Sequence, residues 1–133
     1  MTIQMKQLEN LVTYLNLLIQ TLAFFVGLGN NSVRLEFINK LLCLNCEVIS
    51  LIHPTAYVSP TVKLGVGCCV LPMAVINTDS VIKDGCIINC GAIVDHNCIV
   101  NEGVHICMNA VVKANNEIAS STKIEACCVV ERG

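Results

Sequence analysis

The chain has 133 residues, of which 54% are hydrophobic, 14% charged and 4% aromatic, and its formal net charge is −2 at pH 7. A chain of this length is expected to form one compact domain with at most a small appendage. The slight acidic balance argues against binding to nucleic acid or to an anionic membrane surface. Because so much of the composition is apolar, we expect a partner subunit to cover part of the surface.

Residues 1–22 predict a helix. Aliphatic residues recur at helical spacing, at Leu8, Leu11, Val12, Leu15, Leu18, Ile19 and Leu22. We interpret this segment as a helix that packs within the protein or faces a partner. The alternative is a membrane anchor or signal sequence, because residues 11–28 are largely apolar. Polar groups interrupt that run and no convincing cleavage site follows it, so we expect no membrane association.

The next segment predicts one βαβ unit. Residues 21–28 (TLAFFVGL) form a short apolar run that ends in a glycine-asparagine turn, which indicates a buried strand. Residues 32–44 (SVRLEFINKLLCL) predict a helix, and residues 46–52 (CEVISLI) predict a second, parallel strand. One βαβ unit cannot make a stable sheet alone. We therefore interpret residues 1–51 as a helix followed by part of an α/β domain.

From Ile52 onward the sequence repeats every six residues. Every sixth position is Ile, Leu or Val, at Ile52, Val58, Leu64, Val70, Ile76, Ile82, Ile88, Val94, Val100, Ile106, Val112, Ile118, Ile124 and Val130. Four residues after each comes a second column, small or β-branched except for Asn116: Ala56, Val62, Cys68, Ala74, Ser80, Cys86, Ala92, Cys98, Val104, Ala110, Asn116, Thr122 and Cys128. Neither a helix nor a single strand has this period. A hexapeptide repeat predicts a parallel β-helix.

The repeat also predicts how the coils are built. Three hexapeptides make one coil of about 18 residues, with the aliphatic column inside and the small column near the corners. Residues 52–133 have room for about four and a half such coils. No coil buries its apolar face alone, so stability comes from the stacking of neighbours.

Ten cysteines raise the question of a disulfide framework. Four of them lie in the small column, where a thiol acts as a small hydrophobic group: Cys68, Cys86, Cys98 and Cys128. Cys43 and Cys46 form the C-x-x-C pair, and no second pair or histidine lies at zinc spacing. We therefore predict reduced thiols and a cytoplasmic location.

Residues 26–42 (VGLGNNSVRLEFINKLL) and 51–112 carry a family resemblance, most specifically in the motifs IHPTAYVSP, INCGAIVDHNCIV and VHI. They resemble the sialic acid O-acetyltransferase and UDP-4-amino-sugar N-acetyltransferase family, over about residues 24–130. The resemblance implies a mainly β fold, a left-handed parallel β-helix over residues 52–133, preceded by the partial α/β unit. It further implies an acetyl-CoA-dependent enzyme that acetylates an amine or hydroxyl of a sugar or UDP-sugar, assembled as a homotrimer with acetyl-CoA between neighbouring helices.

The resemblance also implies site residues. The general base of the family is the histidine of an (Asp/Glu)-His motif, which falls on His96 after Asp95. The residue after the base is often acidic in relatives and is Asn97 here, which can accept a hydrogen bond but supplies no charge. The base is then weaker unless Asp95 serves, and in an extended segment the Asp95 side chain starts out on the opposite side from that of His96. A second histidine, which lies near acetyl-CoA in the family, matches His105, and the backbone N–H that holds the thioester carbonyl matches Ala114.

These residue types suit direct acetyl transfer. A neutral imidazole, with an ordinary pKa of about 6.5, accepts the proton that the attacking amine or hydroxyl loses. A backbone donor aimed at the developing oxyanion contributes about 3 kcal/mol in well-studied enzymes. The repeat places His96 and Ala114 on adjacent coils, because they are 18 residues apart, and it stacks Asp95 between Asn77 and Lys113. We expect no metal, since the spacing of His96, His105 and the carboxylates does not match a zinc site.

The chain also departs from the family. Its usual turn glycines are replaced by Asn109, Ala114 and Glu125, which predicts a strained or remodelled corner at Glu125. Relatives begin with a full nucleotide-sugar-binding domain and end with further coils, so we expect this chain to be truncated at both ends. The alternative to an enzyme is therefore a catalytically impaired paralogue that acts as a trimeric scaffold or has no activity.

Overall fold

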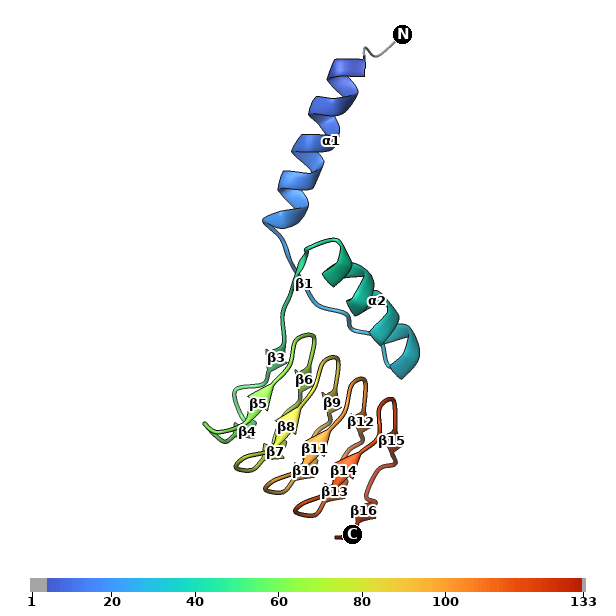
Figure 1. The fold of residues 1–133 in the computed structure, drawn as a ribbon. Coiled ribbons are helices and arrows are strands. Elements are labelled where there is room, and N and C mark those ends of the chain that lie inside the picture. The colour runs from blue at the N-terminus through green and yellow to red at the C-terminus, as the bar shows by residue number, and fades with distance from the viewer. Residues whose placement is uncertain (1–4, 133) are drawn as a thin grey trace.

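The structure, a computed structural model, describes residues 5–132, without the side chains of residues 5–8 and 20. Its N-terminal part contains α1 (Met5–Gln20), β1 (Ala23–Phe24), α2 (Asn31–Cys43) and β2 (Glu47–Val48). Two-residue strands then follow one another from β3 to β16, and Figure 1 shows them as the stacked coils of a solenoid. The predicted division into residues 1–51 and 52–133 stays a prediction.

Successive strands of the solenoid alternate among three parallel sheets, which we call its first, second and third faces. The first face contains β3 (Leu51–Ile52), β6 (Cys69–Val70), β9 (Ile87–Ile88), β12 (His105–Ile106) and β15 (Lys123–Ile124). The second contains β4 (Tyr57–Val58), β7 (Val75–Ile76), β10 (Ile93–Val94), β13 (Val111–Val112) and β16 (Val129–Val130). The third contains β5 (Lys63–Leu64), β8 (Val81–Ile82), β11 (Ile99–Val100) and β14 (Glu117–Ile118). Paired residues such as Ile93 and Val111 are one 18-residue coil apart, so the predicted left-handed β-helix is confirmed.

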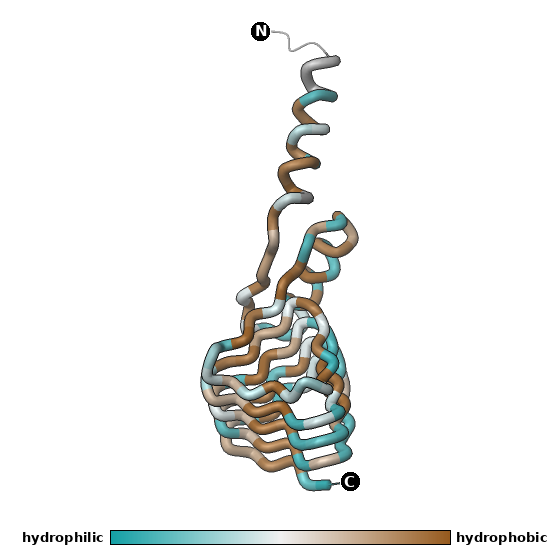
Figure 2. The backbone as a smooth tube through the Cα atoms, turned by 90° about the vertical axis from the view of Figure 1, so that its left-hand side faces the viewer, coloured by the Kyte–Doolittle hydropathy of each residue, from teal (hydrophilic) through white to brown (hydrophobic). Residues whose placement is uncertain are grey.

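The aliphatic column fills the interior of the solenoid. All its members from Val70 to Ile124 are buried, and the small column is fully buried from Cys68 to Ala110. At the N-terminal end the column is less well covered, since Ile52 is 48% exposed. Figure 2 shows the resulting alternation of apolar and polar positions along each coil. The end coils bury less because each has a neighbour on one side only.

The ten cysteines form no disulfide. In the small column their thiols donate to a backbone carbonyl of the next coil: Cys68 Sγ lies 3.1 Å from Lys83 O, and Cys98 Sγ lies 3.2 Å from Lys113 O. Ser80 makes the equivalent bond with its hydroxyl, at 2.7 Å. Hydrogen bonding with Cys68, and then burial, raise the pKa of the Cys86 thiol. Cys68, Cys86 and Cys98 therefore fill space in the interior, as predicted, whereas Cys128 is exposed at the last coil.

From Gly67 onward, each corner contains one residue with a left-handed backbone, directly before the small column. These residues are Gly67, Met73, Asp79, Gly85, Gly91, Asn97, Gly103, Asn109, Asn115, Ser121 and Cys127. The prediction of such a position at Asn109 is confirmed, whereas those at Ala114 and Glu125 are wrong. The left-handed residues nearest to them are Asn115 and Cys127, because the turn is fixed relative to the aliphatic column. Glycine and asparagine take most of these places because they adopt a positive φ at the lowest cost.

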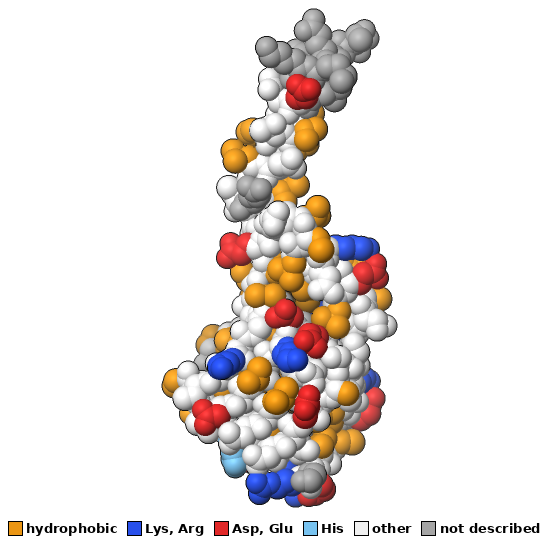
Figure 3. All heavy atoms as spheres, viewed as in Figure 1, with side chains coloured by type: hydrophobic (Ala, Val, Ile, Leu, Met, Phe, Trp, Pro, Cys, Tyr) orange, Lys and Arg blue, Asp and Glu red, His pale blue; other side chains and the backbone are white. Residues whose placement is uncertain are grey.

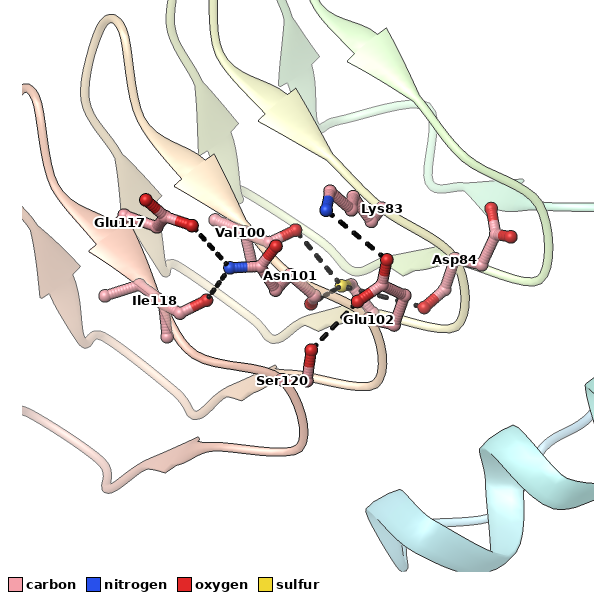
Figure 4. Close-up of polar contacts among 9 residues, drawn as sticks. Lys83, Asp84, Val100, Asn101, Glu102, Glu117, Ile118 and Ser120 are labelled. Atoms are coloured by element: carbon pink, nitrogen blue, oxygen red, sulfur yellow. Dashed lines mark hydrogen bonds and ion pairs between the residues drawn. The ribbon is translucent and has the colours of Figure 1, made fainter.

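Polar side chains on the outside link successive coils next to the third face (Figure 4). Asn101 Nδ2 donates to Glu117 Oε1 and to the carbonyl of Ile118, at 3.1 and 2.8 Å. Glu102 accepts from Ser120 Oγ at 2.8 Å and lies 3.4 Å from Lys83 Nζ. These side chains are partly exposed, so the contacts align the coils more than they stabilise them.

The predicted βαβ unit is present, with one change. β1 and β2 pair in parallel on either side of α2, which Asn30 caps by accepting from Val33 N–H at 3.0 Å. The second strand expected at residues 46–52 is divided into two strands, because β3 pairs with β6 of the solenoid. A Cβ at Gly85 would overlap Ile38 of α2 and one at Gly103 would overlap Leu35, so these glycines let the helix approach the solenoid closely.

Arg34 of α2 fastens the unit to the solenoid. Its side chain is 1% exposed and donates to the carbonyls of Gly85 and Gly103, at 2.7 and 2.9 Å. The other donors reach the carbonyls of Leu28 and Gly29 and Oδ1 of Asn31, so all five guanidinium N–H groups are used. Burial lowers the pKa of Arg34, and its partners are neutral acceptors. One buried side chain thus joins α2, the β1–α2 loop and two coils.

A helix was predicted over residues 1–22. Within the described residues it is present as α1, which ends at Gln20. Figure 1 shows it projecting away from the solenoid, and its apolar side chains remain exposed. Among the described residues, no helix combines the length and apolar character needed to cross a membrane.

Candidate active site

His96 lies in the corner between the second and third faces, directly after β10 (Ile93–Val94). The corner is stacked on the next one along the chain, since Ile93 pairs with Val111 and the amide of Asn115 donates to His96 O at 3.1 Å. Ala114 therefore lies one coil from His96, as the 18-residue spacing predicts. The His96 side chain is exposed, so its ring is open to a substrate.

Asn97 orients the ring of His96. The Asn97 Oδ1 atom lies 2.8 Å from His96 Nδ1. Because an amide oxygen only accepts, this contact in a neutral imidazole selects the tautomer in which Nδ1 carries the proton and Nε2 has the lone pair. Asn97 holds this position from a left-handed backbone, with φ of 58°. The arrangement leaves a proton acceptor at the outer end of the imidazole.

Asp95 contacts the main chain of His96 rather than its ring. The carboxylate Oδ1 accepts from the His96 N–H at 2.8 Å and from Asn77 Nδ2 at 3.1 Å, which confirms the predicted stacking on Asn77. The His96 N–H, and then the Asn77 amide, hold the pKa of Asp95 below its ordinary value. The hydrogen bonds of the Asp95 carboxylate thus go to the main chain and to Asn77, and hold the corner rather than the imidazole ring.

The backbone of Ala114 faces the same carboxylate. Ala114 is 6% exposed, and its N–H is one of the weaker groups that lower the pKa of Asp95. A thioester oxygen held by this amide would therefore compete with Asp95 for it.

His105 lies on the first face, in β12 (His105–Ile106), beside a cavity of about 230 Å³. The cavity separates the loop after β1 from the solenoid, and its lining is mostly apolar. Asn89 Nδ2 lies 3.1 Å from His105 Nε2, which makes Nε2 the acceptor. Burial, and then the nearby cations Arg34 and Lys123, lower the pKa of His105.

One chain does not bring the two histidines together. In a triangular coil, the corner between the second and third faces lies opposite the first face. His96 and His105 therefore point to opposite sides of the solenoid. Among residues 5–132, no three His, Cys, Asp or Glu side chains are placed to hold a metal ion.

Sequence reasoning missed Arg34 and Asn89. Arg34 resembled an ordinary charged residue of a helix, whereas its burial depends on carbonyl groups 51 and 69 residues away. A signal was available in the glycines at 67, 85 and 103, which recur every 18 residues and mark where another element approaches. Asn89 lies 16 residues before His105, off the exact coil spacing, so the repeat does not pair them.

Comparisons with known proteins agree with this fold. No protein-family model matches the chain. UDP-N-acetylbacillosamine N-acetyltransferase of Bacillus subtilis (strain 168) is 38% identical over 60 residues, which are 45% of this chain and 28% of that protein. The acetyltransferase domain of PglB from Neisseria gonorrhoeae FA1090 superimposes with a TM-score of 0.78 at 36% identity, over 79% of this chain and 51% of the domain.

A third relative is perosamine N-acetyltransferase from Caulobacter crescentus, solved as a His-to-Asn variant with CoA and GDP-perosamine. It superimposes with a TM-score of 0.72 at 31% identity, over 90% of this chain and 67% of that protein. The chain spans about half of the PglB domain and a smaller share of the B. subtilis relative. With its hexapeptide columns, three-faced solenoid and these relatives, the chain belongs to the left-handed β-helix, hexapeptide-repeat acyltransferase family.

Proposed function

We propose that this chain is an acetyl-CoA-dependent acetyltransferase that acts on the amine of a nucleotide-linked sugar. Two relatives support this proposal: UDP-N-acetylbacillosamine N-acetyltransferase, and perosamine N-acetyltransferase, which was solved with CoA and GDP-perosamine. A UDP-linked amino sugar is one acceptor of this class. Acetylation of a sugar hydroxyl instead of an amine is the alternative reaction. The observation that carries the proposal is the His96 ring, exposed and held by Asn97 with Nε2 free.

The reaction follows from that geometry. The neutral amine attacks the thioester carbonyl carbon of the co-substrate acetyl-CoA, and a C–N bond forms as the C–S bond breaks. His96 Nε2 accepts the proton that the amine loses, and the CoA sulfur leaves as a thiolate that is then protonated. In this proposal the Ala114 N–H donates to the developing oxyanion in place of its present contact with Asp95, and Asp95 keeps the corner in shape through the His96 N–H. A base of this kind contributes about 10²–10⁴-fold to the rate.

The assembly we propose is a homotrimer with parallel axes. His96 and His105 lie on opposite sides of one solenoid, so a site that uses both must form between two chains. A closed threefold ring places the His96 corner of each chain against the first face of a neighbour three times over. The apolar first-face cavity beside His105 then becomes part of an intersubunit groove. We also propose a cytoplasmic location, which the unpaired cysteines support.

A second candidate is a trimeric scaffold with no activity. Two observations favour it: Asn97 supplies no charge to His96, and the Ala114 amide faces Asp95. Thermal unfolding with and without acetyl-CoA separates binding from no binding, since a bound ligand at about 100 times its Kd stabilises by about 2.7 kcal/mol.

The deciding test is CoA release, with GDP-perosamine and a UDP-4-amino sugar as acceptors. We expect acceptor-dependent release by the wild type, and a loss of about 10²–10⁴-fold in His96→Ala with the acetyl-CoA thermal shift retained. Equally slow release by the two proteins would reject the enzyme and leave the scaffold.

A further inference from the structure

The α1 helix (Met5–Gln20) presents an apolar face to solvent. Its members are Leu11, Val12, Leu15, Leu18, Ile19 and, just after the helix, Leu22, and they are 37–53% exposed. We call these six residues the leucine face. Figure 3 shows hydrophobic side chains along the projecting helix, and Figure 1 shows no element of the same chain packed along it. At its C-terminal end Ile19 lines a small cavity with Cys43, Leu44 and Asn45 at the end of α2. The rest of the face has no partner within the described part of one chain.

The spacing of the leucine face is that of a helix that packs against another helix. Leu11, Leu15, Leu18 and Leu22 follow each other at intervals of four, three and four residues, and the sequence continues the pattern back to Leu8. These are positions a and d of a heptad repeat. Val12 and Ile19 occupy position e and widen the stripe to roughly 120° of the helix circumference.

The charges of α1 favour a second copy of the same helix over a membrane surface. The helix has two charged residues, Lys6 and Glu9, of opposite sign, and both fall outside the a, d and e positions. Helices that lie on membranes normally carry several Lys or Arg on the polar face, whereas Asn10, Thr13 and Asn16 occupy it here. An uncharged leucine face meets its own copy without like-charge repulsion, as a self-complementary interface requires.

We propose that α1 packs through the leucine face against α1 of a second copy of this chain. This contact is separate from acetyl transfer and from the solenoid contact proposed above. The helix is about 24 Å long, which is two heptads and too short for stable pairing of isolated helices. The pairing therefore depends on concentration, and on the solenoids to which the helices are attached.

The test is sedimentation velocity on the full chain, from about 1 to 100 µM. The variant Leu15→Asp/Leu18→Asp puts two charges on the leucine face. The matched control, Thr13→Asp/Leu17→Asp, puts the same charges on the opposite side of the same helix, where Leu17 is 62% exposed. We expect the face variant to dissociate at a concentration about tenfold or more above the wild type, and the control to match the wild type.

Equal dissociation midpoints for the wild type and the face variant would overturn the proposal, as would an equal shift in the control. A wild type that does not self-associate but binds zwitterionic lipid vesicles through this face would also overturn it, in favour of a membrane. Circular dichroism checks that each variant retains its solenoid. If the aspartates unfold the chain, Leu15→Gln/Leu18→Gln repeats the comparison without charge.

Discussion

The interior of the solenoid and the leucine face of α1 use the same kinds of residue in opposite environments. Ile88 is fully buried because coils 18 residues before and after it cover it. Leu15 and Leu18, equally apolar, remain 47% and 41% exposed because no such neighbour follows α1 in the chain. The difference shows that burial here requires matching residues 18 positions away in the chain, and not hydrophobicity alone. A repeat supplies its own partner, whereas a single amphipathic helix needs one from elsewhere.

The largest expected effect contrasts these two environments directly. Ile88→Ala removes three methyl or methylene groups from a close-packed interior and should lower the free energy of unfolding by about 2–5 kcal/mol. Ile93→Ala on the outer side of β10 and Leu18→Ala on α1 should each change it by about 0.5 kcal/mol or less in dilute solution. Urea unfolding monitored by circular dichroism measures all three. A loss in Leu18→Ala as large as that in Ile88→Ala would show that α1 packs within its own chain.

The next effect tests how firmly the N-terminal unit is joined to the solenoid. Arg34→Met leaves the carbonyls of Gly85 and Gly103 without donors, which should cost about 2–3 kcal/mol. Hydrogen exchange should then speed up across α2 and leave β9–β13 protected. Lys40→Met, at an exposed position of the same helix, is the control. Unchanged exchange in α2 of Arg34→Met would mean that apolar contacts alone hold the unit.

A smaller effect concerns the corner that holds His96. Asn97→Gly keeps a residue suited to a φ of 58° but removes the oxygen that fixes the ring, so kcat should fall roughly tenfold with KM nearly unchanged. Asn109→Gly makes the same change in a corner with φ of 56°, away from His96, and should leave kcat as it is. The reading of Asn97 as a positioning residue fails if both variants have wild-type kcat.

The smallest effect is a pH dependence of stability at the first face. Burial lowers the pKa of His105 in the folded chain, so the unfolded chain binds more protons just below pH 6.5. Stability should therefore be complete above about pH 6.5 and decrease as the pH falls through that value. His105→Gln should show a shallower decrease between about pH 7 and pH 5 in urea unfolding. An identical slope in both proteins would show that His105 titrates normally.

Sequence reasoning predicted what the repeat controls and failed where the chain leaves the repeat. The aliphatic column, the small column with its thiols and the stacking of Asn77 under Asp95 all follow from periods of 6 and 18 residues. The left-handed corners were placed wrongly at Ala114 and Glu125, because the family's turn glycines were matched without reference to the aliphatic column. Arg34 was missed because its acceptors come from two distant coils.

The candidate site was predicted in part. Spacing placed His96 and Ala114 on adjacent coils, and the structure agrees. His105 follows His96 by nine residues, which is one and a half hexapeptides. Spacing alone did not show that this separation places the two histidines on opposite sides of the coil. The alternation of an extended segment did predict that the Asp95 side chain points away from the His96 ring, but not that Asn97 contacts the ring. The roles of these residues stay predictions.

A crystal structure of the chain with CoA tests the central claim, that acetyl transfer takes place at the His96 corner, most directly. The account predicts the CoA sulfur within hydrogen-bonding distance of His96, next to Ala114, in a groove completed by the first face of a second subunit. A CoA sulfur bound on any other corner, or a complex with no second subunit at the His96 corner, would contradict it.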